Sequence, residues 1–260
     1  MEIHKSILNY ETLVLSGHSI KGLVVLGGIQ YLYDNFLLNN IKTFIGTSSG
    51  SIICYLLIIG YTPIEIMVYI CTNQLFEKMQ NFNIVAMMQG RGAMSFNHIQ
   101  EHLEKMTIAK LGYLPTLKNL KDKFDKKLVC VTYNLTKKQT EYLNFENNPD
   151  LPCIIALRMS ANLPLLFESY KYGDSLYIDG GISDNFAIDI EDKDNNKIIG
   201  ILLNCETNKD INTSNTMEFI YNLIFIPVNQ SINLKINNSS KNCQIIKLDC
   251  DNDKKIFDFN

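Results

Sequence analysis

The chain has little of what marks several large classes of protein. Its seven cysteines are scattered over 260 residues without a C-x-x-C pair, which favours a reducing compartment over a disulfide framework or a zinc ribbon. It has no excess of basic charge, because 24 Lys and Arg stand against 27 Asp and Glu. Nucleic acid is therefore not the expected partner.

Targeting and membrane-spanning signals are also lacking. Residues 1–17 have no charged lead, long apolar core or small-residue cleavage site, so we expect no signal peptide. The most apolar stretch, residues 52–71, is interrupted by Gly60, Pro63 and Glu65. Two successive helices are expected there rather than one membrane span of about 20 residues. We expect a cytoplasmic protein that contacts membranes only at their surface.

Short apolar runs alternate with segments of helical spacing along the chain. Strands are expected at 12–17, within 41–47, twice within 126–145, and at 175–181, 197–204 and 243–250; helices are expected at 21–38, from about 49 to 60, and at 62–79, 97–112, 151–161 and 216–234, the last with a proline interruption. This alternation predicts a three-layer α/β/α sandwich with a mainly parallel central sheet. We expect a single domain over 1–260, in which 191–260 completes the sheet and helices.

The pentapeptide Gly46-Thr-Ser48-Ser-Gly50 has the Gly-x-Ser-x-Gly pattern between an expected strand and an expected helix. This pattern places a serine on a sharp turn, pointed at a substrate, and the flanking glycines permit the turn. Since the helix begins near Ser49, its positive end lies beside the reacting oxygen. The alternative is a glycine-rich turn with a capping serine. We expect Ser48 to be a nucleophile.

A serine needs a base, and histidine is scarce. The four histidines are His4, His18, His98 and His102, and none follows residue 102. The order serine, acid, histidine of the α/β-hydrolases is therefore excluded unless the order is permuted. What does occur late in the chain is "YIDGGISDN", a strand that ends at Asp179 and two glycines. On its own, this aspartate is more simply interpreted as part of a solvent-facing turn, for which Asp-Gly is a common sequence.

Four motifs in order resemble the patatin-like phospholipase family: "LSGHSIKG", "GTSSG", "RMSANLPLLF" and "DGGISDN", together covering roughly residues 11–190. The resemblance implies a patatin-like fold and a Ser-Asp dyad, with Ser48 as nucleophile, Asp179 as base and Gly180 positioning the aspartate. It implies hydrolysis of acyl esters in phospholipids or lysolipids at a membrane surface, without a metal or cofactor. A carboxylate near its ordinary pKa is a weak base, so burial of Asp179 is expected.

The resemblance also implies an oxyanion hole made by backbone N–H groups of the first glycine loop, which comprises Gly17, His18, Ser19, Ile20, Lys21 and Gly22. Here the chain departs from the family, which has three consecutive glycines where this loop has Gly17-His18-Ser19. Removing one oxyanion donor typically costs about 10²–10³ in rate. The chain also has Ala187 where the family has proline. A catalytically weak lipid- or protein-binding relative is therefore the alternative function.

A third function comes from "HIQEH" at 98–102, which matches the H-x-x-E-H pattern of zinc peptidases. Such a site needs a third ligand, and the sequence does not single one out. An exposed polar helix face is the simpler interpretation. Similarly, the lysine-rich stretch 118–127 is expected to be a solvated loop, with contact to anionic lipid headgroups as the lesser alternative.

Overall fold

The computed structural model describes residues 9–18, 22–73, 92–193, 195–204 and 216–249, with the single residues 75, 87 and 89. Along the chain its elements are β1 (Thr12–Leu15), α1 (Gly22–Asp34), β2 (Thr43–Thr47), α2 (Ser49–Ile58), α3 (Pro63–Thr72), α5 (Asn97–Leu111), α6 (Leu117–Phe124), β3 (Lys127–Asn134), β4 (Gln139–Leu143), α7 (Cys153–Ser160), β5 (Tyr170–Tyr172), β6 (Ser175–Asp179), the 3₁₀ turns η3 (Gly180–Ile182) and η4 (Ile188–Ile190), β7 (Ile198–Asn204), α8 (Thr216–Asn238) and β8 (Cys243–Asp249).

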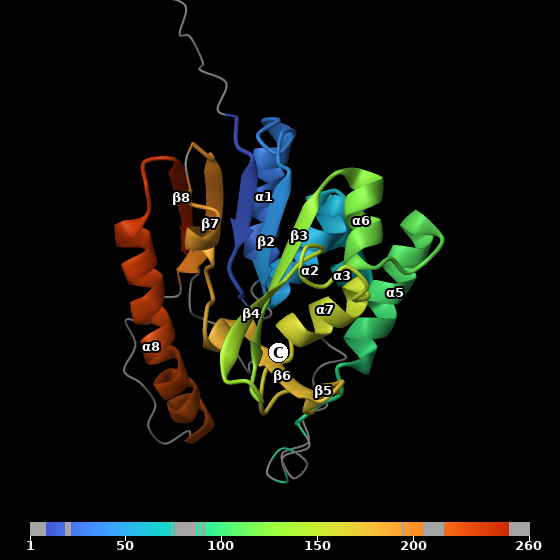
Figure 1. Ribbon diagram of the computed structural model, residues 1–260, viewed down its shortest axis with the longest axis vertical. Coiled ribbons are helices and arrows are strands. Elements are labelled where there is room, and N and C mark those ends of the chain that lie inside the picture. The colour runs from blue at the N-terminus through green and yellow to red at the C-terminus, as the bar shows by residue number, and fades with distance from the viewer. Residues whose placement is uncertain are drawn as a thin grey trace, which may run out of the picture.

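The strands form one sheet in the order β5-β6-β3-β2-β1-β7-β8, and β4 pairs with β3. Strands β3, β2, β1, β7 and β8 are parallel, while β4, β5 and β6 are antiparallel to their neighbours. Helices flank the sheet, with α8 set apart from the others (Figure 1). The predicted three-layer sandwich with a mainly parallel sheet is confirmed.

The two outer layers differ in thickness. On one face, a large apolar core joins the sheet to helices α1, α2, α3, α5, α6 and α7. On the other face, a smaller core joins Val14, Ile45, Val129 and Val131 of the strands to α8 and to the segment around Phe186. Central parallel strands are thereby buried on both faces, as is usual in α/β proteins.

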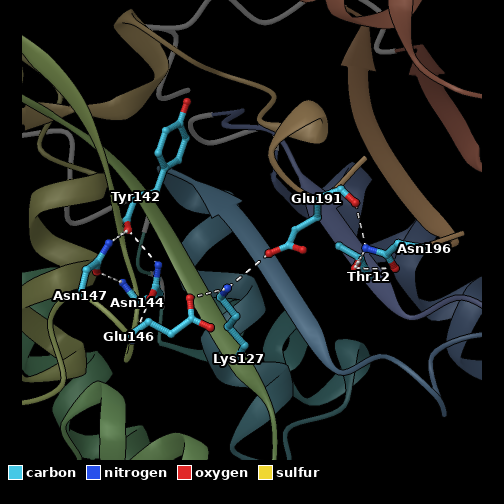
Figure 2. A network of polar contacts seen from close by, with 8 residues as sticks. All are labelled: Thr12, Lys127, Tyr142, Asn144, Glu146, Asn147, Glu191 and Asn196. Atoms are coloured by element: carbon cyan, nitrogen blue, oxygen red, sulfur yellow. Dashed lines mark hydrogen bonds and ion pairs between the residues drawn. The ribbon is translucent and has the colours of Figure 1, made fainter. Parts of the chain in front are cut away.

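Polar contacts join neighbouring segments at the amino-terminal ends of the strands. At the start of β3, the Lys127 ammonium lies 2.9 Å from a Glu146 carboxylate oxygen and 3.3 Å from one of Glu191 (Figure 2). Beside them, the Asn196 amide donates to the Thr12 hydroxyl at 3.1 Å, which joins β7 to β1. The loops that build the site lie at the opposite ends of the strands, their carboxyl ends.

The apolar stretch 52–71 is two helices, as predicted. Helix α3 begins with the expected capping box, in which Thr62 and Glu65 exchange hydrogen bonds, and Pro63 occupies its first turn. Among the described residues, no single helix is long and apolar enough to cross a membrane; α2 and α3 pass that test only as a pair, with a bend of 120° between them.

Two expectations about secondary structure were wrong, and one strand was missed. Lysines 118–123 lie in helix α6 rather than in a loop, because a capping box at Thr116 and Asn119 starts a helix whose Leu117 and Leu120 are buried. Strand β5 was not predicted. Helix α8 runs through Pro227 without the expected interruption and continues to Asn238.

The capping box of α6 generates a stability prediction. Thr116→Ala removes the side-chain oxygen that accepts from the Asn119 N–H at 3.2 Å, and we expect the free energy of unfolding to fall by about 1 kcal/mol. Thr116→Ser keeps this oxygen and is the matched control. Urea denaturation measures both, and equal stabilities of the two variants would contradict the role of the cap.

Candidate active site

Ser48 lies on a strained turn at the carboxyl end of β2. Strand β2 ends at Thr47 and helix α2 begins at Ser49, so the expected strand–turn–helix context is present. The Ser48 backbone has φ 55° and ψ −126°, and such conformations cost a non-glycine residue about 1–3 kcal/mol. The Ser48 N–H donates to Ser160 Oγ at 3.0 Å, and the Ser51 hydroxyl donates to the Ser48 carbonyl at 2.6 Å. Hydrogen bonds on both sides therefore hold the strained residue.

The two glycines of the elbow permit close packing. A Cβ atom on Gly46 would lie 2.3 Å from the Cα of Ser51 on the next helix. One on Gly50 would lie 2.6 Å from the carbonyl oxygens of Leu15 and Ser16, at the end of β1. Any side chain at either position would push α2 away from the strands.

Strand β3 brings Asp179 to the same place as Ser48. Along β3, residues 127–131 pair with β2 and residues 132–134 pair with β6, while β4 pairs with residues 130–134. Since each residue has one partner on each side, β4 occupies one edge and β2 and β6 share the other. Thr47 pairs with Val131 and Asp179 pairs with Thr132, so β2 and β6 meet end to end.

Both strands must leave the sheet at the point where they meet. A Cβ on Gly180, the residue after Asp179, would lie 2.2 Å from the Val131 carbonyl oxygen, on the strand that both share. The chain leaves the sheet there through the 3₁₀ turn η3, just as it leaves β2 through the turn at Ser48. The two turns therefore present Ser48 and Asp179 to one another.

The Asp179 carboxylate is buried, with 2% of the residue exposed. One oxygen, Oδ1, accepts from the Gly181 N–H at 2.7 Å. The other, Oδ2, has no hydrogen-bond partner among the described residues. The Asp179 N–H donates to the Asn162 carbonyl at 3.0 Å, which fixes the backbone in place. One carboxylate oxygen is therefore held and the other is available to take a proton.

Burial raises the pKa of Asp179 from 3.8 to about 6, and the nearby Ser48 hydroxyl and the Gly181 N–H oppose this rise. Ser48 is thus close enough to act on the carboxylate, although their contact does not reach full hydrogen-bond geometry. The expected burial of Asp179, with its rise in pKa, is confirmed.

The glycine loop is tied to the rest of the site through its first two N–H groups. Gly17 donates to Asn185 Oδ1 at 3.0 Å, and His18 donates to Ser49 Oγ at 3.1 Å. Both groups were expected to stabilise an oxyanion, and in this structure both have protein partners. Of the other expected loop residues, Gly22 begins α1, whereas Ser19, Ile20 and Lys21 lie outside the described residues.

The side chain of His18 is buried. Burial lowers its pKa to about 3, so the imidazole is neutral at pH 7. Its Nδ1 lies 3.2 Å from Ser49 Oγ, and its Nε2 has no partner among the described residues. The histidine therefore contacts the serine after Ser48 and is a poor base.

Sequence reasoning did not assign roles to Ser160, Asn162 and Asn185. The Ser160 hydroxyl accepts a hydrogen bond from the Ser48 N–H and donates one to the Val131 carbonyl at 2.6 Å. The Asn162 carbonyl accepts a hydrogen bond from the Asp179 N–H, and the Asn185 side-chain oxygen accepts one from the Gly17 N–H. All three lie inside the motifs "RMSANLPLLF" and "DGGISDN". The motifs therefore pointed to these residues, but they did not identify the hydrogen-bond partner of any of them.

The H-x-x-E-H segment has a structural explanation. The rings of His98 and His102 pack edge to face, with centroids 4.7 Å apart. His102 is buried, against the expected exposed face, and a ring nitrogen lies 2.9 Å from the Tyr69 hydroxyl. Within the part of the chain that the structure describes, no three His, Cys, Asp or Glu side chains gather as metal ligands would.

The fold and the motifs match proteins of one family. The family model for patatin-like phospholipase matches residues 13–192. A protein of invertebrate iridescent virus 6 named "Probable lipid hydrolase 463L" is 38% identical over 194 residues, 72% of this chain and 65% of that protein. Protein R571 of Acanthamoeba polyphaga mimivirus, described as uncharacterized, is 31% identical over 244 residues, 90% of this chain and 78% of its own length.

A solved structure shares the fold. The crystal structure of VipD from Legionella pneumophila superimposes with a TM-score of 0.57 at 16% identity, over 93% of this chain and 61% of that chain. The chain therefore spans less than two thirds of the length of both VipD and the iridovirus protein. The family model covers well over half of the chain, and on this ground the chain belongs to the patatin-like phospholipase family.

Proposed function

We propose that this protein hydrolyses acyl esters of lipids, with Ser48 as the nucleophile and Asp179 as the general base. The observation that carries the proposal is the buried Asp179 carboxylate, whose raised pKa suits a base and which lies beside a serine on a strained strand-to-helix turn. A base works best when its pKa lies near the working pH. Membership of the patatin-like family supports the same assignment.

The reaction proceeds in two halves. Ser48 Oγ attacks the ester carbonyl carbon while Asp179 Oδ2 takes the hydroxyl proton, and the bond to the leaving alcohol breaks as that alcohol takes the proton from Asp179. Water then attacks the acyl-Ser48 ester, giving its proton to Asp179. The proton returns to Ser48 Oγ as the fatty acid leaves. Both halves balance without a metal, a cofactor or a histidine.

The negative oxygen that forms during attack needs hydrogen-bond donors. The amino terminus of α2 begins at Ser49, and its positive end lies beside the reacting atoms. The loop from Gly17 to Gly22 supplies the remaining donors. For the His18 N–H to do so, the Ser49 hydroxyl that now accepts from it must turn aside.

Phospholipids or lysolipids at a membrane surface are the substrates we propose. The similarity to a viral protein named as a probable lipid hydrolase supports a lipid, and the family model is that of a phospholipase. The protein would approach its substrate as a peripheral protein, from the cytoplasmic side.

The second candidate function is a lipid- or protein-binding relative with weak catalysis. The observation that favours it is that the Gly17 and His18 N–H groups already have protein partners. Covalent capture by a fluorophosphonate probe separates the two functions, because an active dyad labels at Ser48 and a binding protein does not.

Loss of either dyad residue should abolish hydrolysis. We expect the wild type to release fatty acid from mixed phospholipid vesicles with a chelator present, and Ser48→Ala and Asp179→Asn to lower kcat by at least about 10³-fold, because each removes a group that acts in the transition state. Asp122→Asn is the matched control, since this aspartate is exposed and, among the described residues, forms an ion pair only with Lys118. Release that persists in Ser48→Ala would refute the assignment.

The activity should depend on the ionisation of Asp179. Because the base must be ionised, kcat/KM should rise with pH through about 6 and level off above it. A pH profile with an inflection near 4 would mean that Asp179 is not shielded as the structure describes. Wild-type kcat/KM on one phospholipid, measured from pH 4 to pH 8, decides between these outcomes.

Asp179 should also make stability depend on pH. Its pKa is raised from 3.8 to about 6 on folding, so its favourable contribution is full below about pH 4 and is lost as pH rises through 6. Relative to Asp179→Asn, the wild type should lose about 2 kcal/mol of unfolding free energy between pH 4 and pH 7. Denaturation of both proteins at these two pH values measures the difference, and parallel changes would contradict the burial of a charge.

A further inference from the structure

Asp184 is a second buried acid close to the dyad, and its partners come from distant parts of the chain. Its side chain is 6% exposed. The Tyr142 hydroxyl on β4 donates to Oδ2 at 2.8 Å, and the Lys235 ammonium on α8 lies 2.7 Å from the same oxygen. Burial, together with the charges of Asp184 and Asp189, raises the pKa of Tyr142, so this hydroxyl remains a donor.

Tyr142 is itself held through its backbone. Its carbonyl accepts from the side-chain amides of Asn144 at 3.1 Å and Asn147 at 2.9 Å, while its ring points away from both (Figure 2). The tyrosine therefore reaches Asp184 from a fixed position on β4.

The backbone of Asp184 and the side chain of Asn185 contact three parts of the site. The Asp184 N–H donates to the Gly180 carbonyl at 2.8 Å, beside Asp179. The Asp184 carbonyl accepts from the Thr47 hydroxyl at 3.1 Å, beside Ser48. Asn185 accepts from the Gly17 N–H and donates to the Gly17 carbonyl at 3.3 Å. The base, the nucleophile and the glycine loop are thus joined through two consecutive residues.

We propose that Lys235 is a positioning residue for this site, which it holds through Asp184. This inference rests on the proposed function. Lys235 belongs to α8, beyond the residues 13–192 that the family model matches, and α8 lies on the face of the sheet away from the other helices (Figure 1). The helix therefore anchors the catalytic turn in addition to covering the sheet.

The charge of Lys235 is what this role requires. A buried carboxylate that loses its cation is strongly destabilised, and it must then take a proton or move toward water. Either response disturbs the Asp184–Asn185 backbone and so displaces the groups that it holds. Small displacements of catalytic groups lower the rate of the chemical step by up to about 10²-fold.

Lys235 provides its own matched control, because it has a second acidic partner. Its ammonium lies 2.6 Å from Asp189 Oδ1, whose side chain is 55% exposed and does not contact the dyad turn through any described hydrogen bond. Asp189→Asn removes this exposed pair and leaves the buried pair with Asp184. An effect specific to the buried pair is therefore separable from a general effect on the lysine.

The test compares Lys235→Met, Lys235→Arg and Asp189→Asn with the wild type. The readouts are kcat and KM on phosphatidylcholine vesicles and the rate of fluorophosphonate labelling at Ser48. We expect Lys235→Met to lower kcat and the labelling rate by about 10- to 100-fold with KM unchanged. Lys235→Arg should restore most of both rates, and Asp189→Asn should leave them at the wild-type level. A Lys235→Met protein with wild-type kcat and labelling rate overturns the inference.

A double variant keeps the test decisive if Lys235→Met folds poorly. In Lys235→Met/Asp184→Asn the buried charge is gone, while the asparagine oxygen can still accept from Tyr142. The double variant should therefore fold better and label faster than Lys235→Met alone; purely additive losses overturn the inference. A wild type that neither hydrolyses lipid nor labels at Ser48 refutes the proposed function itself, whereas an active wild type with an unaffected Lys235→Met refutes only the role of Lys235.

Discussion

The pairing of β3 with two strands along one edge is the constraint on which the site depends. β2 approaches from one end and stops at Thr47, and β6 approaches from the other and stops at Asp179, so their carboxyl ends meet. Two backbones cannot occupy the same edge, and each must leave the sheet abruptly. The turn at Ser48, with its positive φ, and the 3₁₀ turn at Gly180 are the two exits. Proximity of the two side chains is thus a consequence of sheet register.

In the proposed mechanism, burial gives the Asp179 carboxylate the proton affinity that a histidine supplies in other serine hydrolases. An aspartate with a pKa near 4 would bind the serine proton too weakly, and its closed environment raises the pKa to about 6. Burial carries a free-energy cost, because an ionised carboxylate is kept from water and its Oδ2 has no hydrogen-bond partner in the part of the chain that the structure describes. The hydrogen bond from the Gly181 N–H to Oδ1 offsets part of that cost and leaves Oδ2 for the proposed proton transfer.

The sequence predicted the layers of the fold, which the structure confirms. It also proposed Ser48 and Asp179 as a dyad, and the structure brings the turns that carry these two residues together. Strand and helix periodicity is local, so the α/β alternation could be read directly, and the elbow and the D-G-G turn are short motifs. The end-to-end meeting of β2 and β6 depends on a register between residues 47, 131, 132 and 179, which no local pattern encodes. For the same reason the burial of His18 and the partners of Asn185 were beyond prediction. Helix α6 was missed because its many lysines favoured a solvated loop, although the same segment contains a capping box and two buried leucines.

The glycine loop illustrates how side chains can replace backbone freedom. Three consecutive glycines allow a loop to approach a reacting centre closely, whereas this loop has His18 and Ser19 after Gly17. In compensation, the Asn185 side chain bonds both the N–H and the carbonyl of Gly17, and Ser49 bonds both the N–H and the ring of His18. Gly17 and His18, the described start of the loop, are therefore held by residues next to Ser48 and shortly after Asp179. Because Asn185 follows Asp184, and the Asp184 carbonyl accepts from the Thr47 hydroxyl, movement of that buried acid would displace Gly17 and the turn at Ser48 together.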